Sequence, residues 1–237
     1  MQMENEKDIL KYVYKFVFTD GTEKTFEIKL DSESLNIIRA EKEYPDWTKF
    51  ENFSCEHCPL NKSPQSHCPV AMNLSDIIEF FTNTPSYEES KIYVLSTERQ
   101  YAKKTSVQVG VSSIIGILMA TSGCPHLEKM KPMVRFHLPF ASLEETEFRV
   151  MSMYLLAQYF RSKNNQTPDW ELKGLMKIYE DIQKVNQNVA AKIADLERRD
   201  TSINAVVVLN NFADFVTFTI DEKDFGHLEK MFRSFLD

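Results

Sequence analysis

The sequence contains no block of five or more basic residues, and this absence bears on its partners. The 237-residue chain has 28 Lys and Arg against 35 Asp and Glu, a formal net charge of −7 and a pI near 5.4. Duplex nucleic acid is bound by clustered cations that neutralise phosphates. We therefore expect no nucleic-acid partner.

Long apolar runs are also missing. No segment approaches the roughly 18 consecutive apolar residues that a membrane-spanning helix needs. Residues 1–8 lack a basic stretch leading into an apolar one, as a secretory leader would have. These observations predict no membrane association and a cytoplasmic location. Since cytoplasmic thiols are kept reduced, cysteines there are expected to serve as metal ligands or redox groups before disulfides.

The familiar sequence signatures of enzymes are absent as well. The chain has no Gly-rich phosphate loop, no nucleophile elbow and no His-x-x-x-His pair, and no internal repeat is evident. Its 43% apolar composition is enough for an ordinary hydrophobic core. The sequence therefore predicts a globular fold and leaves open whether the protein is an enzyme.

The four cysteines, in contrast, fall in only two places. Cys55 and Cys58 form a Cys-x-x-Cys pair, Cys68 follows in the same stretch, and Cys124 lies in a distant Gly-Cys-Pro turn. Thiolates at i and i+3 can bind one metal ion from a single turn, and two more soft donors complete a tetrahedral shell. Proline follows three of the cysteines and restricts each of them to extended conformations. The pattern predicts that all four cysteines bind one metal centre.

Two kinds of metal centre suit this ligand set. A closed shell of four ligands is typical of structural zinc, which is the ion we expect. An iron–sulfur cluster is the alternative, because Cys-Pro steps recur beside cluster ligands. His57 and His67 each adjoin a ligand cysteine and can replace one or face solvent. The cysteines can also be small core hydrophobes, or Cys55 and Cys58 a labile disulfide, but polar loops broken by proline are unusual places for core residues.

Two further segments carry side chains that are common in functional sites. His137 lies in an extended run, Arg-Phe-His-Leu-Pro-Phe, where it can be a ligand, an acid–base group, a switch or a hydrogen-bonded core histidine. A polar run enters the apolar helix expected after residue 106, with spacing suited either to an anionic ligand or to a solvated hairpin edge. Its polar residues are Arg99, Tyr101, Lys104 and Gln108.

The periodicity of apolar residues predicts an α+β fold. Alternating β-formers predict one hairpin from residues 10–18 and 23–30 around Asp20-Gly21, and a second from 91–97 and 100–105. Apolar residues at three- and four-residue steps predict helices. Asn73 is expected to cap a short helix that stops before Pro85. Trp47 to Phe53 is a candidate extended segment. The longer predicted helices cover 106–123, 143–161, 170–196, 202–219 and 222–236.

These elements predict two halves packed as one unit. Residues 1–140 form an α+β half that contains the β-hairpins and the cysteines, and residues 141–237 form a helical bundle. The 170–196 helix would be about 40 Å long at 1.5 Å per residue, longer than the neighbouring 143–161 and 222–236 helices can cover. We therefore expect part of its apolar stripe to pack against a second protein molecule, most simply in a homodimer. The alternative is that the 202–219 helix and the β half cover it.

Several motifs together carry a resemblance to a known family. They are Cys-x-x-Cys-Pro-Leu, Cys-Pro-Val-Ala, Met-Ala-Thr-Ser-Gly-Cys-Pro, Arg-Phe-His-Leu-Pro-Phe, Tyr-Leu-Leu-Ala-Gln-Tyr-Phe and Pro-Asp-Trp. The set spans nearly the whole chain and resembles an uncharacterised bacterial family of unknown function. The resemblance implies a cytoplasmic bacterial protein and assigns no activity to any residue.

The sequence alone thus indicates a cytoplasmic metal-binding protein with a four-cysteine structural zinc site, acting as an interaction or regulatory module. The alternative is an iron–sulfur sensor or oxidoreductase that uses the same cysteines, with His137 and Arg99 near its substrate.

Overall fold

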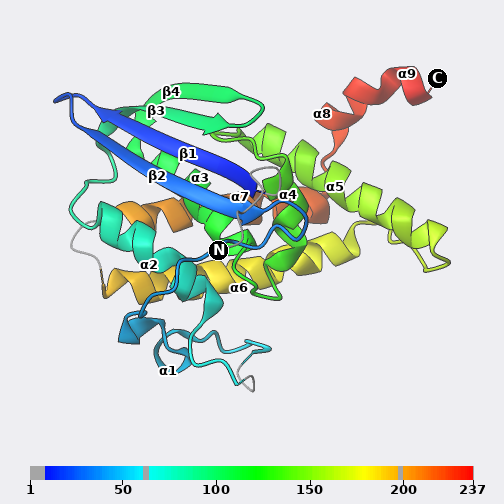
Figure 1. The fold of residues 1–237 in the computed structure, drawn as a ribbon. Helices are drawn as coiled ribbons and strands as arrows, with labels where there is room; N and C mark the ends of the chain where they lie inside the picture. The colour runs from blue at the N-terminus through cyan, green and yellow to red at the C-terminus, as the bar shows by residue number, and fades with distance from the viewer. Residues whose placement is uncertain (1–8, 61–63, 197–199, 237) are drawn as a thin grey trace.

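The structure, a computed structural model, describes residues 9–60, 64–196 and 200–236. The expectation about a leader sequence in residues 1–8 therefore lies outside the described residues. A four-stranded antiparallel sheet lies at one side of the molecule, and helices pack beneath it (Figure 1). The predicted α+β fold class is confirmed.

The sheet consists of the two predicted hairpins placed side by side. Strands β1 (Ile9–Phe18) and β2 (Glu23–Asp31) form the first, and β3 (Glu89–Ser96) and β4 (Gln100–Ser106) form the second. Pairing of β1 with β3 gives the strand order β2-β1-β3-β4. Alternation along β1 places one row of aromatic side chains in the core, as expected from a period of two. These side chains are Tyr12, Tyr14, Phe16 and Phe18.

The helices form the remaining layers. The α-helices are α1 (Phe50–Phe53), α2 (Pro69–Phe81), α3 (Val107–Ala120), α4 (Lys131–Arg135), α5 (Leu143–Lys163), α6 (Lys173–Ala194), α7 (Thr201–Glu222), α8 (Gly226–Glu229) and α9 (Arg233–Leu236). Short 3₁₀ turns are η2 (Asp46–Thr48), η3 (Glu128–Met130) and η4 (Lys230–Phe232). A capping box formed by Ser142 and Glu145 opens α5, the helix predicted over 143–161, with both of its hydrogen bonds present.

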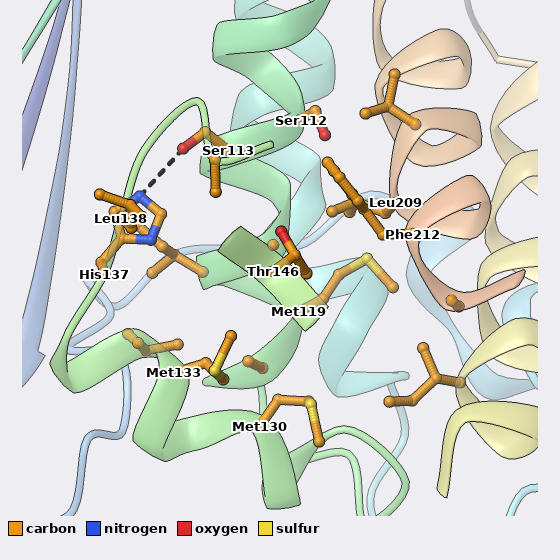
Figure 2. A pocket seen from close by; sticks show the side chains of 18 of the residues that line it. Ser112, Ser113, Met119, Met130, Met133, His137, Leu138, Thr146, Leu209 and Phe212 are labelled. Carbon is orange, nitrogen blue, oxygen red and sulfur yellow. Dashed lines mark hydrogen bonds between the residues drawn. The ribbon is translucent and has the colours of Figure 1, made fainter. Parts of the chain in front are cut away.

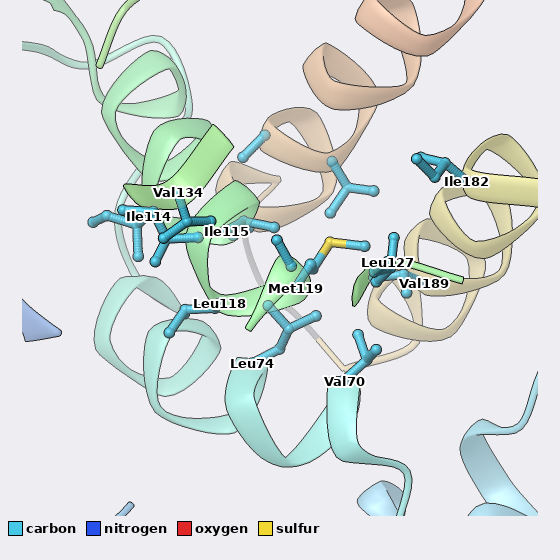
Figure 3. Close-up of a cluster of buried hydrophobic side chains, with 14 of the residues drawn as sticks. Val70, Leu74, Ile114, Ile115, Leu118, Met119, Leu127, Val134, Ile182 and Val189 are labelled. Carbon is cyan, nitrogen blue, oxygen red and sulfur yellow. The ribbon is translucent and has the colours of Figure 1, made fainter. Parts of the chain in front are cut away.

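Helix α3 is the centre of the core. It contacts the sheet on one side and α7 on the other, and α2 packs beside it. Gly110 permits the close approach to the sheet, since a Cβ there would lie 2.6 Å from Ile92 Cδ1 and 2.8 Å from Phe16 Cε1. Side chains from α2, α3 and α6 meet in the buried cluster that Figure 3 shows. Among them are Val70, Leu74, Ile114, Ile115, Leu118, Met119, Ile182 and Val189.

The start of α2 differs from the prediction. Asn73 was expected to cap the helix, but the helix begins at Pro69 with Cys68 at the N-cap position. Proline is favoured in the first turn because it lacks the N–H that would be unsatisfied there. Asn73 is instead buried, where its Nδ2 donates to the Leu118 carbonyl (2.7 Å) and its Oδ1 accepts from Arg39 Nε (2.7 Å).

Two other segments also differ from expectation. Trp47 to Phe53 is not extended, because η2 and α1 occupy it. The 222–236 region is not one amphipathic helix but the short turns α8, η4 and α9. Leu228 is buried, whereas Phe235 is 83% exposed, so the apolar spacing there has little surface to pack against.

Helix α6 lies within the core instead of protruding. It has 22 residues, about 33 Å, and packs along α7. The buried members of its stripe are Leu175, Tyr179, Ile182, Val185, Asn186, Val189 and Ile193. These residues are buried within the chain, mainly along α7. A second protein molecule stays a prediction. Exposed apolar side chains are found on α5 instead.

Helix α7 is long and apolar enough to cross a membrane by length and composition, with a mean hydropathy of 1.5 over its most apolar stretch. Core helices pass the same test, and α7 packs against α3 and α6. The predicted division near residue 140 falls between α4 and α5, while one buried cluster draws on residues from both sides of it. The two-half division stays a prediction.

The Asn73 hydrogen bonds give the first testable prediction. Asn73→Ala would leave the buried Leu118 carbonyl and the partly buried Arg39 guanidinium without this partner, so we expect the free energy of unfolding to fall by roughly 1–3 kcal/mol. Urea denaturation measures the change. The control is Asn52→Ala, an exposed asparagine, which should stay within about 0.5 kcal/mol. Equal losses in the two variants would contradict the role assigned to Asn73.

Candidate metal centre

The four cysteines come from separate segments and line one small cavity. Cys55 and Cys58 lie in the turn after α1, Cys68 precedes α2, and Cys124 follows α3. The volume of the cavity is about 10 Å³, and α6 supplies part of its wall. The other lining residues are Phe53, Leu60, Pro69, Val70, His126, Val185 and Val189.

Backbone hydrogen bonds fix the first three thiols in place. The Cys58 N–H donates to the Cys55 carbonyl (3.1 Å) and closes a tight turn. The Cys68 N–H donates to the Thr48 carbonyl (2.8 Å), which ties the start of α2 to η2. Since Pro69 occupies the first turn of α2, Cys68 is held in an extended conformation at the helix N-terminus.

Cys124 is fixed by the end of α3. Gly123 adopts a φ of 93°, a value that favours glycine, and reverses the chain there. The Cys124 N–H donates to Ser122 Oγ (3.2 Å), and its carbonyl accepts from Leu127 and Glu128 (both 3.0 Å). The predicted place of Cys124, just past a helix C-terminus between Gly and Pro, is confirmed.

The thiols influence one another electrostatically. Burial raises the pKa of Cys55 to about 12 and that of Cys124 to about 11, and it also raises the pKa of Cys68. Charge on neighbouring thiols raises these pKa values further: Cys58, Cys68 and Cys124 act on Cys55, Cys58 acts on Cys68, and Cys58 and Cys68 act on Cys124. Every pair in the set therefore interacts. Four thiolates can coexist here only if a cation compensates their charge.

The spacing of the sulfur atoms is wider than in a closed zinc shell. All four cysteines are free, and in the described part of the chain no three of their sulfurs lie within 4.8 Å of one another. A tetrahedral shell with Zn–S bonds of about 2.3 Å would place its sulfurs about 3.8 Å apart. The structure thus brings the predicted ligands to one cavity without closing a shell around its centre.

The histidines named in the sequence analysis divide among three places. His67 lies outside the thiol cavity, with Nδ1 2.7 Å from Ser66 Oγ. His57 turns toward His126 and Asp181, and these three residues bring ligand atoms within 4.8 Å of one another. Burial lowers the pKa of His57, and the nearby His126 lowers it further. No sequence pattern singles out Asp181, because it lies on α6, more than 50 residues from His126.

His137 lies in a different pocket (Figure 2). Its Nε2 is 2.6 Å from Tyr14 Oη and 3.0 Å from Ser113 Oγ, and these two hydroxyls are 2.8 Å apart. The pocket has a volume of about 220 Å³ and is lined mainly by apolar side chains from α3, α4, α6 and α7. Burial, and then the nearby Arg149, lowers the pKa of His137 to about 3. These contacts are those of the hydrogen-bonded core histidine that we considered.

The fold and the thiol cavity define an α+β protein with four converging cysteines. Residues 12–233 match the family described as a domain of unknown function, DUF6901, and the chain belongs to this family. The predicted membership of a family of unknown function is confirmed. No curated protein and no solved structure matches the chain.

The His137 contacts predict a pH dependence of stability. In the unfolded chain the imidazole has a pKa of about 6.5, whereas in the folded protein its pKa is about 3. Between these values the unfolded state binds a proton that the folded state does not, so the free energy of unfolding falls as the pH falls. His137→Gln removes this contribution. The variant should therefore lose about 2 kcal/mol less than the parent between pH 7 and pH 5 in urea denaturation.

His67→Gln is the control for this experiment, because it makes the same replacement at a histidine that lies outside the His137 pocket. It should keep more of the parent's loss between pH 7 and pH 5 than His137→Gln does. Parallel pH profiles for the parent and His137→Gln would show that His137 does not titrate as a buried neutral group.

Proposed function

We propose that the chain is a metal-binding protein in which Cys55, Cys58, Cys68 and Cys124 hold a structural zinc ion. The observation that supports this proposal is that all four thiols line one small cavity. The cavity, about 10 Å³, has room for about one water-sized particle, which suits a single ion better than a larger cluster. Rotation of the short cysteine side chains can bring the sulfurs inward to tetrahedral spacing.

The physical role of such an ion follows from the segments that it would join. Residues 32–60 and 64–68 contain few regular hydrogen bonds, and the end of this stretch would be joined by one ion to the end of α3. An ion bound only in the folded state contributes its binding free energy to folding. The protein would then be an interaction or regulatory module whose described fold depends on metal.

An iron–sulfur cluster is the alternative, and the sulfur spacing supports it. The ligands of a cluster bind different iron atoms instead of one common ion, so they can be farther apart than the ligands of zinc. The wider spacing of the four sulfurs fits this arrangement. With a cluster the protein would be a redox sensor or an oxidoreductase.

Cys124→Ala tests the proposal. The parent, prepared without oxygen, should be colourless and contain one zinc per chain, and the variant should lose the ion. We expect the variant to lose at least about 2 kcal/mol of stability, which for a chain of this length lowers the Tm by about 4 °C or more. A strong chelator should lower the Tm of the parent to a similar extent and leave that of the variant unchanged.

Two outcomes would contradict the zinc proposal. Brown protein containing iron and acid-labile sulfide would establish the iron–sulfur alternative. Parent protein with four freely titratable thiols and no stoichiometric metal would overturn both proposals.

The predicted second protein molecule also stays a proposal, and α5 supports it better than α6. Leu156 and Phe160 on α5 are 54% and 55% exposed, and α5 extends beyond the sheet (Figure 1). An antiparallel pairing of two copies about a two-fold axis would bury these apolar residues.

Leu156→Glu should abolish such a dimer, because a carboxylate would be buried at its centre without a partner. Light scattering at micromolar concentration measures the mass, which for one chain is 27.6 kDa. Phe218→Glu is the control, since Phe218 is an exposed apolar residue on α7. A parent that keeps the mass of one chain at every concentration would reject self-association.

A further inference from the structure

A second group of metal-binding side chains lies beside the thiol cavity. His57 comes from the Cys-x-x-Cys turn, His126 from the segment after Cys124, and Asp181 from α6. One nitrogen from each ring and one oxygen from the carboxylate lie within 4.8 Å of one another. The two rings have their centroids 4.5 Å apart. Two imidazoles and one carboxylate are a common ligand set for divalent transition metals.

The hydrogen bonding of His126 leaves one ring nitrogen available. Its Nε2 lies 3.2 Å from the His57 carbonyl oxygen, and since a carbonyl only accepts, this nitrogen carries the hydrogen. In the neutral ring Nδ1 then has a lone pair, and it faces Asp181 Oδ2 across 3.9 Å. Two acceptors that face each other favour a cation between them. A second ring nitrogen that donates to a carbonyl is also the usual support of a metal-bound histidine.

A buried nitrogen of His57 gives a second, independent reason to expect a ligand here. The His57 Nε2 is buried from solvent and has no hydrogen-bond partner within the described part of the chain. A buried nitrogen without a partner destabilises the fold, and a metal–ligand bond would offset that cost. One ring nitrogen of His57 lies within 4.8 Å of the ligand atoms of His126 and Asp181, so this ring can supply the third ligand.

Asp181 is held so that one oxygen is directed to the same place. Its Oδ1 lies 3.4 Å from Lys177 Nζ and 3.7 Å from Lys184 Nζ, while Oδ2 is the oxygen that faces His126. The lysines are exposed and fix the carboxylate from the solvent side. Metal bonds of about 2.0–2.2 Å from Nδ1 and from Oδ2 can span the 3.9 Å gap with a small inward movement.

We propose that His57, His126 and Asp181 bind one divalent transition-metal ion of the zinc class, separate from the four-cysteine site. Three protein ligands leave at least one coordination position for water, as in open zinc sites, whereas four thiolates would close a shell. The site requires no thiol ligand, so it goes beyond the four-cysteine proposal. Because imidazole and carboxylate donors also suit cobalt, Co²⁺ can report on the site by its visible absorption.

The experiment titrates freshly prepared full-length protein with Co²⁺ and follows the visible spectrum. The parent should bind one Co²⁺ with weak visible bands and without the intense thiolate-to-cobalt charge transfer of cysteine ligation. Asp181→Asn should weaken this binding by roughly tenfold or more, since loss of even an outer-shell partner has an effect of that size. The matched control is Glu180→Gln, the neighbouring carboxylate, which pairs with the same Lys177.

A direct readout identifies the ligands. With the diamagnetic ion Zn²⁺, the ring signals of His57 and His126 in NMR spectra should shift on binding, while those of His67 should not. Elemental analysis of Asp181→Asn before titration reports the four-cysteine site, because this variant lacks the carboxylate ligand of the second site. Failure of the proposed His57–His126–Asp181 site can therefore be distinguished from failure of the proposed four-cysteine site.

Three results would overturn this proposal. Equal Co²⁺ affinity in the parent and in Asp181→Asn would exclude the carboxylate ligand. Intense charge-transfer bands with no further equivalent of Co²⁺ bound would assign all the binding to the thiols. Unchanged His57 and His126 signals with saturating Zn²⁺ would leave the three residues as a hydrogen-bonded surface cluster only.

Discussion

The need to cover α3 on every side determines the arrangement of the other elements. This helix combines β-branched and other apolar side chains around most of its circumference, so no face of it suits water. The sheet covers one side, where Gly110 lets the helix approach Phe16 and Ile92, and α7 covers the other. Both ends of the helix are thereby fixed in space. The turn that follows it, with Cys124, has a defined position before any metal is considered.

A second constraint acts on the segment between the sheet and α2. In residues 32–60 and 64–68 the regular structure consists of short helical turns and isolated β-bridges, and side-chain contacts add to their order. The guanidinium of Arg39 donates to Asn73 Oδ1 (2.7 Å) and to the Ser122 carbonyl (2.9 Å), which ties this segment to α2 and to the end of α3. Burial lowers the pKa of Arg39, and a partly buried cation is retained because both contacts are hydrogen bonds. These contacts hold the segment that precedes Cys55 against α2 and the end of α3.

The sequence predicted the elements whose periodicity matches their burial. Alternation along β1 and the three- and four-residue steps of α3 are local patterns, and each of these faces is buried in the fold. The predicted start of α2 was wrong. Asn73 is a residue type favoured at helix N-caps, but here it forms tertiary hydrogen bonds, and Cys68 takes the cap position. The 222–236 prediction was wrong because apolar spacing forms a packed helix only where a surface exists to receive it.

In the candidate sites, too, the sequence predicted features that depend on neighbouring residues and did not predict those that depend on tertiary packing. Cys55 and Cys58 could be paired from sequence spacing, and Gly and Pro beside Cys124 predicted a fixed turn. No local pattern, however, could predict that Asp181 faces His57 and His126, because the length and packing of α6 bring it there.

The two candidate centres share segments of the chain, and this has an energetic consequence. His57 lies between two of the proposed thiol ligands, and His126 lies two residues after a third while also lining the thiol cavity. Backbone hydrogen bonds already hold these two turns, and an ion at either centre would restrict the motion that remains in them. The second ion would then bind turns whose remaining motion is already reduced, which makes its binding more favourable. By linkage the first ion is stabilised to the same extent, and the coupling acts through the turns themselves.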